Sequence, residues 1–430
     1  MFKSLITTLF IAFIAFNLQA QKLNRTERKI IDRVKSLDEE SLSFLEQVVN
    51  INSGTLNQKG VKEVGNVFRS AFQEIGFQTQ WIDMPAEMNR AGHLFASING
   101  DKGKKLLLIG HLDTVFEKNS PFQTFERIND SMAYGPGAND MKGGDVIVLY
   151  ALKALADLNL LNKSNITVAF TGDEESTGKP LTISREALIE AGKKADIALG
   201  FETATGFDNA TIARRGASGW SVEVKGKRAH SSGVFNERVG AGAIFEMSRI
   251  LNAFYEEVRG EEYLTFNPGT LLGGTFVDYD KQTSSGSTFG KTNVVAQTAV
   301  VNGGLRFISE EQKENARAKM REIVSQNLPQ TSASISFTDS YPAMGPTEGN
   351  QAVLETLSEV SQDLGFGPVT GYDPSRRGAA DISFVANYVD GLDGLGTMGN
   401  GAHTPQETVN LKTMNALIQR AALLIYRLTR

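Results

Sequence analysis

Histidine and carboxylate side chains recur in this sequence just beyond predicted strands or inside glycine-rich loops. The five segments that carry them are GHLDT (110–114), GPGANDMKGG (135–144), TGDEES (171–176), GFETA (200–204) and GNGAHTPQE (399–407). In open α/β sheets, functional groups collect beyond the carboxyl ends of the strands. We therefore expect these side chains to meet at one edge of a sheet, where they could bind metal ions.

Imidazole and carboxylate ligands without thiolate suit zinc, with manganese or cobalt as possible substitutes. The chain has no cysteine and only four histidines, at positions 93, 111, 230 and 403. The adjacent acids Asp173, Glu174 and Glu175 would repel one another unless a cation neutralised them. Taken singly, each segment also fits a solvated acidic turn or a hydrogen-bonded structural histidine, and His93 is interpreted as structural. The recurrence of the pattern favours a metal site, in which a carboxylate between two ions could bridge them.

The glycine-rich loop 135–144 matches neither of the two common phosphate-binding patterns, G-x-G-x-x-G and G-x-x-x-x-G-K-[ST]. A nucleotide site is therefore disfavoured. The glycines instead permit a tight backbone that aims Asp140 into the site. His111 follows the apolar run 106–109 directly and is a candidate metal ligand, whose ring Asp113 could orient.

Length and composition describe an ordinary globular protein. The 430 residues are 41% hydrophobic and 22% charged, with a formal net charge of −5. These values exclude a disordered, collagen-like or polytopic membrane protein, and the acidic balance argues against nucleic acid as a partner. Residues 1–20 have the pattern of a cleaved signal peptide, with an uncleaved anchor helix as the alternative. We therefore expect export, a periplasmic or secreted location, and no membrane contact after cleavage.

Alternating strand and helix patterns predict an α/β fold with a mostly parallel sheet and helices on both faces. The predicted strands are 94–98, 105–110, 166–170 and 197–201, and the predicted helices are 42–50, 61–75, 143–158, 183–191, 353–364 and 411–428. A separate block has predicted strands at 220–224, 263–266, 294–307 and 333–337 and predicted helices at 239–254 and 310–324. Its βαββαβ order predicts a ferredoxin-like domain inserted at 217–340 between two parts of the sheet domain, 21–216 and 341–430. The Ser- and Thr-rich stretch 282–290 is interpreted as a mobile loop.

The segments GHLDTV, GPGANDMKGG, TGDEEST, GFETATG and GNGAHTPQE, in this order, closely resemble the motifs of the dizinc exopeptidase and amidohydrolase family. That family includes bacterial glutamate carboxypeptidase, aminoacylase and succinyl-diaminopimelate desuccinylase. The resemblance implies two zinc ions per chain, with Mn²⁺ or Co²⁺ as possible substitutes. The implied ligands are Asp140 as the bridge, His111 and Glu202 at one ion, and Glu175 and His403 at the other. It also implies a cis peptide bond between residues 140 and 141.

The resemblance further implies catalytic and substrate-binding roles. Glu174 would be the general base for a metal-activated water, and Asp113 would support His111. The residues implied to bind substrate are His230, Asn293, Arg306 and Arg377. Because an arginine fork suits a carboxylate, the expected partner is a small peptide or N-acyl amino acid with a free carboxylate.

The inserted domain is expected to be a lid and dimerisation domain of a homodimer. In dimeric members of the family the lid histidine acts from the other subunit. Hinge closure of the lid over the substrate would bring His230 and Arg306 to the metals. The segment 276–291 is longer than usual for the family.

Three functions follow as hypotheses. The leading one is a glutamate carboxypeptidase-like metallo-exopeptidase that hydrolyses the amide bond next to a C-terminal residue. The nearest alternative is an N-acyl amino acid deacylase or a dipeptidase, which would use the same metals. A catalytically inactive peptide-binding protein is the alternative from another class, and the complete set of ligand positions together with Glu174 argues against it.

Overall fold

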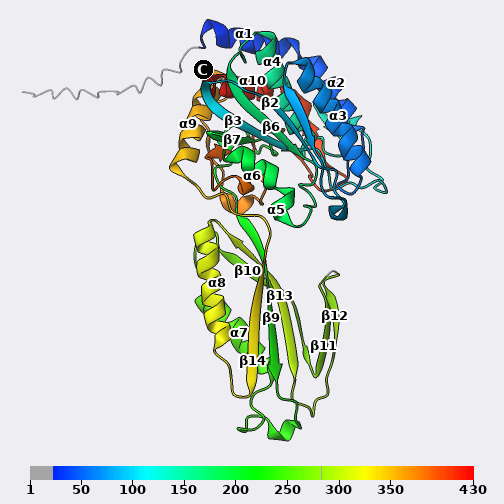
Figure 1. Cartoon of the computed structure of the whole chain (residues 1–430), viewed down its shortest axis with the longest axis vertical. Helices are drawn as coiled ribbons and strands as arrows, with labels where there is room; N and C mark the ends of the chain where they lie inside the picture. The colour runs from blue at the N-terminus through cyan, green and yellow to red at the C-terminus, as the bar shows by residue number, and fades with distance from the viewer. Residues whose placement is uncertain (1–22, 282) are drawn as a thin grey trace, which may run out of the picture.

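The computed structural model describes residues 23–281 and 283–430. The segment 1–20, interpreted as a signal peptide, lies outside the described residues. Within the described ranges, no helix is long and apolar enough to cross a membrane. The chain forms an α/β domain and a second, elongated domain that extends from it on two connections (Figure 1).

The α/β domain is built on a six-stranded sheet with the strand order β1-β2-β6-β3-β7-β16. These strands are β1 (Gln78–Ile82), β2 (His93–Ile98), β3 (Lys102–His111), β6 (Ser164–Thr171), β7 (Ile197–Gly200) and β16 (Gly391–Leu392). The pairs β6–β3, β3–β7 and β7–β16 are parallel, whereas β1–β2 and β2–β6 are antiparallel. The run 106–109 in β3 is buried, as expected for a strand covered on both faces. The predicted α/β class with a mostly parallel sheet is confirmed.

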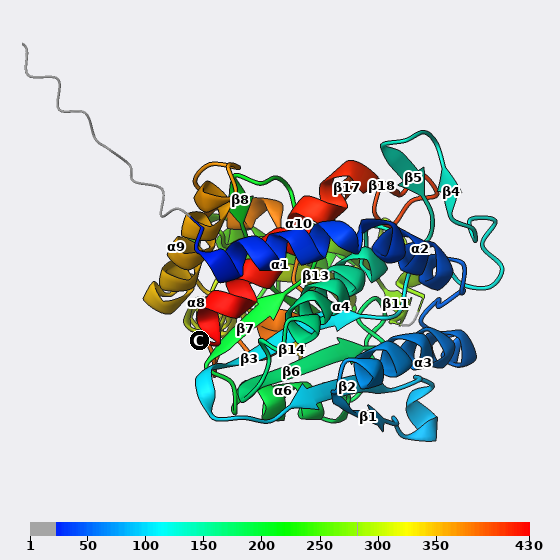
Figure 2. The ribbon, with the colours of Figure 1, turned by 90° about the horizontal axis from the view of Figure 1, so that it is seen from above.

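Helices cover both faces of this sheet, most of them on one side (Figure 2). The more heavily covered face carries α1 (Arg25–Ser36), α2 (Asp38–Val49), α3 (Gln58–Glu74), α4 (Lys142–Asp157) and α10 (Leu411–Leu428). The other face carries α5 (Leu181–Ser184) and α6 (Glu186–Gly192), and α9 (Glu348–Asp363) packs beside β16. The prediction of one continuous helix over 183–191 is therefore wrong. The helix is interrupted at Arg185, whose side chain is fully buried.

The second domain is a four-stranded antiparallel sheet with the strand order β10-β13-β9-β14. Its elements are β9 (Gly216–Gly226), α7 (Ala243–Glu257), β10 (Thr265–Gly274), β13 (Thr298–Phe307), α8 (Glu310–Ser325) and β14 (Thr331–Asp339). The order along the chain is the predicted βαββαβ, so the ferredoxin-like prediction is confirmed. Both helices pack on the same sheet around a separate core that includes Trp220, Phe254 and Met320. We call this unit the lid domain.

Most of the stretch that composition predicted as a mobile loop is a strand, at 285–289, while residue 282 lies outside the described residues. Strand β11 (Phe276–Asp280) pairs antiparallel with β12 (Ser285–Phe289), and together they form a hairpin beside the lid sheet (Figure 1). The Thr288 hydroxyl donates to the backbone oxygens of Gly273 and Phe276, both at 3.0 Å. The hydrogen bond to Gly273 ties the hairpin to β10, a contact that residue composition does not reveal.

Short elements complete the α/β domain. A small sheet contains β4 (Glu126–Arg127), β5 (Met132–Tyr134), β17 (Gly399–Asn400) and β18 (Thr408–Asn410), and β8 (Asn209–Ala210) pairs with β15 (Thr370–Gly371). The single-turn helices are η1 (Ala86–Met88), η2 (Ser231–Gly233) in the lid, η3 (Pro374–Arg376) and η4 (Asp381–Phe384). The small sheet brings the loop before α4 and the loop between β17 and β18 to the same place.

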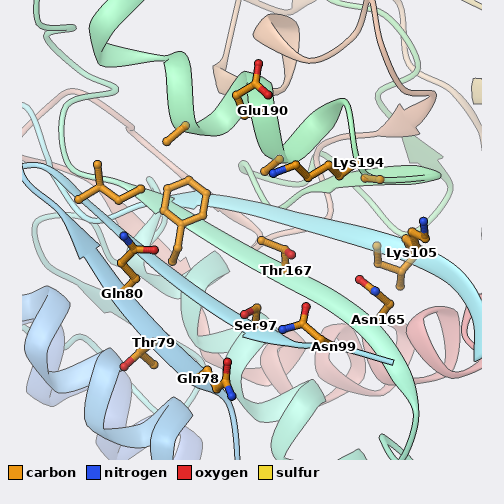
Figure 3. Close-up of a pocket in the computed structure, with 16 residues that line it drawn as sticks. Gln78, Thr79, Gln80, Ser97, Asn99, Lys105, Asn165, Thr167, Glu190 and Lys194 are labelled. Atoms are coloured by element: carbon orange, nitrogen blue, oxygen red, sulfur yellow. The ribbon is translucent and has the colours of Figure 1, made fainter. Parts of the chain in front are cut away.

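A hollow of about 560 Å³ lies between α6 and the faces of β1, β2 and β6 (Figure 3). Uncharged polar side chains such as Gln80, Ser97 and Thr167 line it, together with Lys105 and Lys194. It exists because α6 has only seven residues and leaves this part of the sheet uncovered. None of the five histidine- and carboxylate-bearing segments contributes to it.

The aromatic centre of the α/β domain gives a test of the fold. Phe68 is fully buried, and its ring centroid lies 5.3 Å from those of both Phe44 and Phe170. We expect Phe68→Ala to lower the free energy of unfolding by about 3–5 kcal/mol in chemical denaturation, because it removes buried area and leaves a cavity. Leu56→Ala, at a half-exposed side chain, is the control and should cost less than about 1 kcal/mol. Equal losses in the two variants would contradict this packing.

Candidate metal centre

Six side chains converge at the carboxyl edge of the six-stranded sheet. They are His111 at the end of β3, Asp140 before α4, Glu174 and Glu175 after β6, Glu202 after β7, and His403 between β17 and β18. Because β6, β3 and β7 are parallel neighbours, their carboxyl ends lie side by side. The structure therefore brings together all five sequence-predicted metal ligands and the predicted general base.

Asp140 lies at the centre of this cluster. Its Oδ1 is 3.6 Å from Nε2 of His111, and its Oδ2 is 3.2 Å from Nε2 of His403. Oε1 of Glu202 lies 3.5 Å from the same His111 nitrogen, and Oε2 of Glu175 lies 3.0 Å from the same His403 nitrogen. The two oxygens of one carboxylate thus face two separate histidine–glutamate pairs.

The environment of His111 fits a metal ligand. Its Nδ1 lies 3.0 Å from the backbone oxygen of Asp113, which requires a hydrogen on Nδ1 and leaves the lone pair on Nε2 when the ring is neutral. That Nε2 is buried and has no hydrogen-bond partner. A buried imidazole nitrogen facing carboxylates without a hydrogen bond is the arrangement expected where a cation belongs, and the donor set without sulfur suits zinc.

The pKa values of the two histidines also indicate a site for cations. Hydrogen bonds to Asp140 and Glu175 raise the pKa of His403 to about 11. Burial lowers the pKa of His111, but the carboxylates of Asp113, Asp140 and Glu202 outweigh it and raise that pKa well above its usual value. The cluster of acids therefore demands positive charge, which protonated histidines supply in the absence of other cations.

Asp113 fixes the loop that carries the two adjacent glutamates. Its Oδ1 accepts from the backbone N–H of Glu174 at 3.0 Å, and its Oδ2 accepts from that of Glu175 at 3.1 Å. The Thr55 hydroxyl also donates to Oδ2, at 2.6 Å. Asp113 therefore contacts both the ring of His111 and the backbone of this loop. The sequence predicted only its contact with His111.

Glu407 fixes the backbone at Asp140 by accepting hydrogen bonds from its N–H groups, as Asp113 fixes the backbone at Glu174 and Glu175. Its Oε1 accepts from the backbone N–H groups of Asn139 at 2.8 Å and Asp140 at 2.9 Å. Burial raises the pKa of Glu407 to about 7. The peptide bond between Asp140 and Met141 is cis, as the family resemblance implied. Sequence reasoning gave Glu407 no role, although it closes the segment GNGAHTPQE.

A buried ion network below the glutamate loop was also missed. The fully buried Arg185 donates from Nη1 to Asp173 at 2.5 Å and from Nε to Asp381 at 2.8 Å. His93 is buried beside it: its Nδ1 accepts from the Gly172 N–H at 3.2 Å, and its Nε2 lies 2.7 Å from a backbone oxygen. The only sequence signal for this network was the first acid of the run 173–175, next to the two candidate site residues.

Two arginines lie beside Glu202. The predicted substrate residue Arg377 donates to the backbone oxygen of Thr203 at 2.9 Å. Arg214, which sequence reasoning missed, is buried and pairs with Asp393 at 2.7 Å, and Asp393 in turn accepts from the Glu202 N–H at 3.3 Å. The position of Arg377 next to a candidate ligand is compatible with its predicted contact to substrate.

The other three predicted substrate residues lie on the lid, where His230 and Asn293 are neighbours and Arg306 lies far from both. Arg306 pairs with Ala217 at the start of β9, near the connections to the α/β domain, whereas His230 follows the far end of β9. Asn293 lies next to His230, since its backbone oxygen accepts from the N–H of residue 231. A strand of this length spans about 30 Å. The expectation that one lid closure carries both His230 and Arg306 to the metals is therefore wrong, because they belong to opposite ends of one rigid sheet.

Comparison with known proteins decides the family. A family model described as peptidase family M20/M25/M40 matches residues 107–427. The chain belongs to this family. This M20 chain is therefore a metallopeptidase or amidohydrolase, and the resemblance stated from its motifs is confirmed.

Relatives of this M20 chain are distant but cover most of its length. It is 26% identical over 388 residues to carboxypeptidase G2 of Pseudomonas sp. (strain RS-16), which covers 89% of this chain and 88% of the relative. It is 23% identical over 389 residues to succinyl-diaminopimelate desuccinylase of Rickettsia bellii (strain RML369-C), and this match covers 87% of this chain and 93% of the relative. Among solved structures, the aminopeptidase PepT from Bacillus cereus ATCC 10987 has a TM-score of 0.72 at 18% identity, with 91% and 99% covered. This last similarity concerns the fold.

The raised histidine pKa values predict proton release on metal binding. At pH 7 His403 carries a proton in the metal-free protein, since its pKa is about 11, and a histidine must be neutral to bind a metal. Adding Zn²⁺ should release about one proton per histidine that becomes a ligand, and the affinity should fall as the pH is lowered from 8 to 6. Calorimetric titration in two buffers of different ionisation enthalpy measures this release. Binding heats that do not depend on the buffer would contradict the cluster described here.

Proposed function

We propose that this M20 chain is a dizinc metallo-exopeptidase of the glutamate carboxypeptidase type, which hydrolyses the amide bond next to a C-terminal residue. The observation that carries the proposal is Asp140, whose two oxygens face two separate histidine–glutamate pairs. Such a carboxylate can bridge two divalent ions. Ligand atoms of His111, Asp140 and Glu175 lie within 4.8 Å of one another, and so do those of His111, Glu174 and Glu202, which shows that the cluster is compact enough to hold an ion, although neither set matches the proposed division of the ligands between two ions.

In the proposed ligand set, His111 and Glu202 would hold one ion, Glu175 and His403 would hold the other, and Asp140 would contribute to both. When bound, the two ions supply Lewis-acid activation of a water and of the scissile carbonyl. The remaining work falls to the protein. Asp113 and Glu407 keep the ligand-bearing backbone in place through their hydrogen bonds to it.

Glu174 is the proposed general base. Its carboxylate points into the cluster, with ligand atoms of His111 and Glu202 within 4.8 Å. Burial raises the pKa of Glu174 well above its usual value, which improves its match to a proton acceptor working near neutral pH. It would take a proton from the attacking water and return it to the leaving amine.

Substrate recognition is proposed to rest on a free carboxylate. Arg377 lies beside Glu202 and offers a guanidinium near the reacting centre. A hollow of about 560 Å³ is lined by Asn139, Thr203 and Ala402, each the sequence neighbour of a candidate ligand, but by none of the candidate ligands themselves.

An N-acyl amino acid deacylase is the second candidate, because a desuccinylase is among the relatives and would use the same centre. A panel of C-terminal dipeptides, aroyl-glutamate conjugates and N-acetyl amino acids separates the two candidates by their best substrate. A peptide-binding protein without activity would bind members of this panel without turning them over.

Replacing Glu174 tests the general-base assignment. We expect Glu174→Gln to retain its metal while turnover falls by about 10²–10⁴-fold, because the amide cannot accept the proton. Metal content by mass spectrometry and amide hydrolysis are measured on the same samples. Glu186→Gln, at an exposed position on α6, is the matched control and should behave as wild type. Undiminished turnover in Glu174→Gln would refute the assignment.

We also propose that the protein works as a homodimer through the lid, with His230 and Asn293 reaching the metals of the partner subunit. The separation of about 30 Å between the two ends of β9 supports this, since the same lid cannot present Arg306 and His230 to one small substrate. Exposed apolar side chains on the lid supply a surface for pairing. They are Phe235, Ile244, Phe245, Leu271, Phe276 and Phe289.

Complementation between two inactive variants tests this arrangement. His230→Ala and Glu174→Gln should each be nearly inactive as homodimers. Coexpressed in equal amounts, they should recover about a quarter of wild-type turnover, because half of the dimers are mixed and one of their two sites is intact. Coexpression of Glu174→Gln with the double variant Glu174→Gln/His230→Ala is the control and should recover nothing. Absence of recovery in the first pair would contradict a shared site.

A further inference from the structure

Tyr341 stands where the lid domain returns to the α/β domain. It follows the end of β14 by two residues, and its backbone oxygen accepts from the N–H of Ala217 in β9 at 2.8 Å. The backbones of Arg214 and Met344 also pair across the two connections. Both connections between the domains are thus held together at this point, and Tyr341 lies at the pivot of any rotation of the lid about them.

The side chain of Tyr341 points away from the lid, into the α/β domain. Its ring packs against Phe384 with the centroids 4.9 Å apart. Its hydroxyl donates to the backbone oxygen of Glu174 at 2.7 Å. The Thr177 hydroxyl lies 2.8 Å from the same tyrosine oxygen and completes its hydrogen bonding. A residue of the connection to the lid therefore contacts the backbone of the proposed general base.

Glu174 is consequently held from two sides. Its N–H is bound by Asp113, which belongs to the metal centre, and its C=O is bound by Tyr341, which belongs to the connection to the lid. Burial raises the pKa of the Tyr341 hydroxyl, so the hydroxyl keeps its proton and remains a donor at every working pH. In the described part of the chain the other hydroxyl near this carbonyl is that of Thr177, at 3.5 Å, and its one hydrogen is directed to the Tyr341 oxygen at 2.8 Å.

We propose that the Tyr341 hydroxyl is a positioning group that couples the orientation of the lid to the placement of the Glu174 carboxylate. The inference rests on the proposed role of Glu174 as general base. In this arrangement the lid does more than contact substrate, because its orientation also sets where the base lies. A small displacement of a positioned catalytic group is enough to change turnover by an order of magnitude or more.

Tyr341→Phe removes only the hydroxyl and keeps the ring on Phe384. Hydrogen exchange followed by mass spectrometry is the first measurement, because it needs no substrate. We expect peptides that cover 172–178 to exchange about tenfold faster in the variant, since the loop loses the hydrogen bond that Tyr341 donates to the Glu174 carbonyl. Tyr388→Phe is the matched control, because the Tyr388 side chain is exposed and its hydroxyl makes no hydrogen bond to any of the described residues; its exchange should equal that of wild type. Unchanged exchange in Tyr341→Phe would overturn the proposal whether or not a substrate is known.

Kinetics then separate positioning from a merely structural role. Tyr341→Phe should lower kcat about tenfold, with KM within about twofold of wild type and full metal content. In a Glu174→Asp background the shorter side chain has already moved the carboxylate out of place. There the same change should lower kcat by less than about threefold. An equal loss in both backgrounds, a loss of metal, or an unchanged kcat would each overturn the proposal. If Glu174→Gln were fully active, the proposed function would fail instead, and the exchange result would still report on the link between lid and loop.

Discussion

The structure depends on the crowding of four carboxylates at one edge of a sheet. Asp140, Glu174, Glu175 and Glu202 meet there because β6, β3 and β7 are parallel neighbours and the loop before α4 joins them. Like charges in such a buried place are unfavourable without compensating cations. The two histidines of the cluster acquire raised pKa values for this reason, and a pair of divalent ions would satisfy the same demand with more charge.

Around this cluster, hydrogen bonds to the backbone do most of the positioning. Asp113 binds the glutamate loop and Glu407 binds the peptide groups before α4, so each acid orders a loop, and Asp113 also contacts the ring of His111. One layer further out, the fully buried Arg185 joins Asp173 to Asp381, two residues from segments that are far apart in the sequence. Tyr341 extends this scheme to the lid. The centre is therefore held by groups that belong to several separate segments, which explains why its geometry survives the interruption of the domain by the lid.

Much of the fold and of the centre was predictable from local patterns. The apolar run 106–109 indicated a buried strand, and the helical spacing of apolar residues in 61–75 indicated the helix α3. The positions of His111, Glu174 and Glu202 just beyond predicted strands indicated where the candidate site lies. Long-range relations were not predictable in this way. The insertion of β6 between β2 and β3, the pairing of Arg185 with Asp381, and the hairpin β11–β12 all depend on contacts that no local pattern encodes. The distance between Arg306 and His230 was likewise not predictable. It depends on the register in which β13 pairs with β9, and this pairing is a long-range contact.

Anomalous diffraction from crystals of the zinc-loaded protein would show whether one carboxylate serves two metal sites. We expect two peaks per chain, one beside His111 and Glu202 and the other beside His403 and Glu175, with Asp140 between them. A single peak, or two peaks that do not share Asp140, would contradict it.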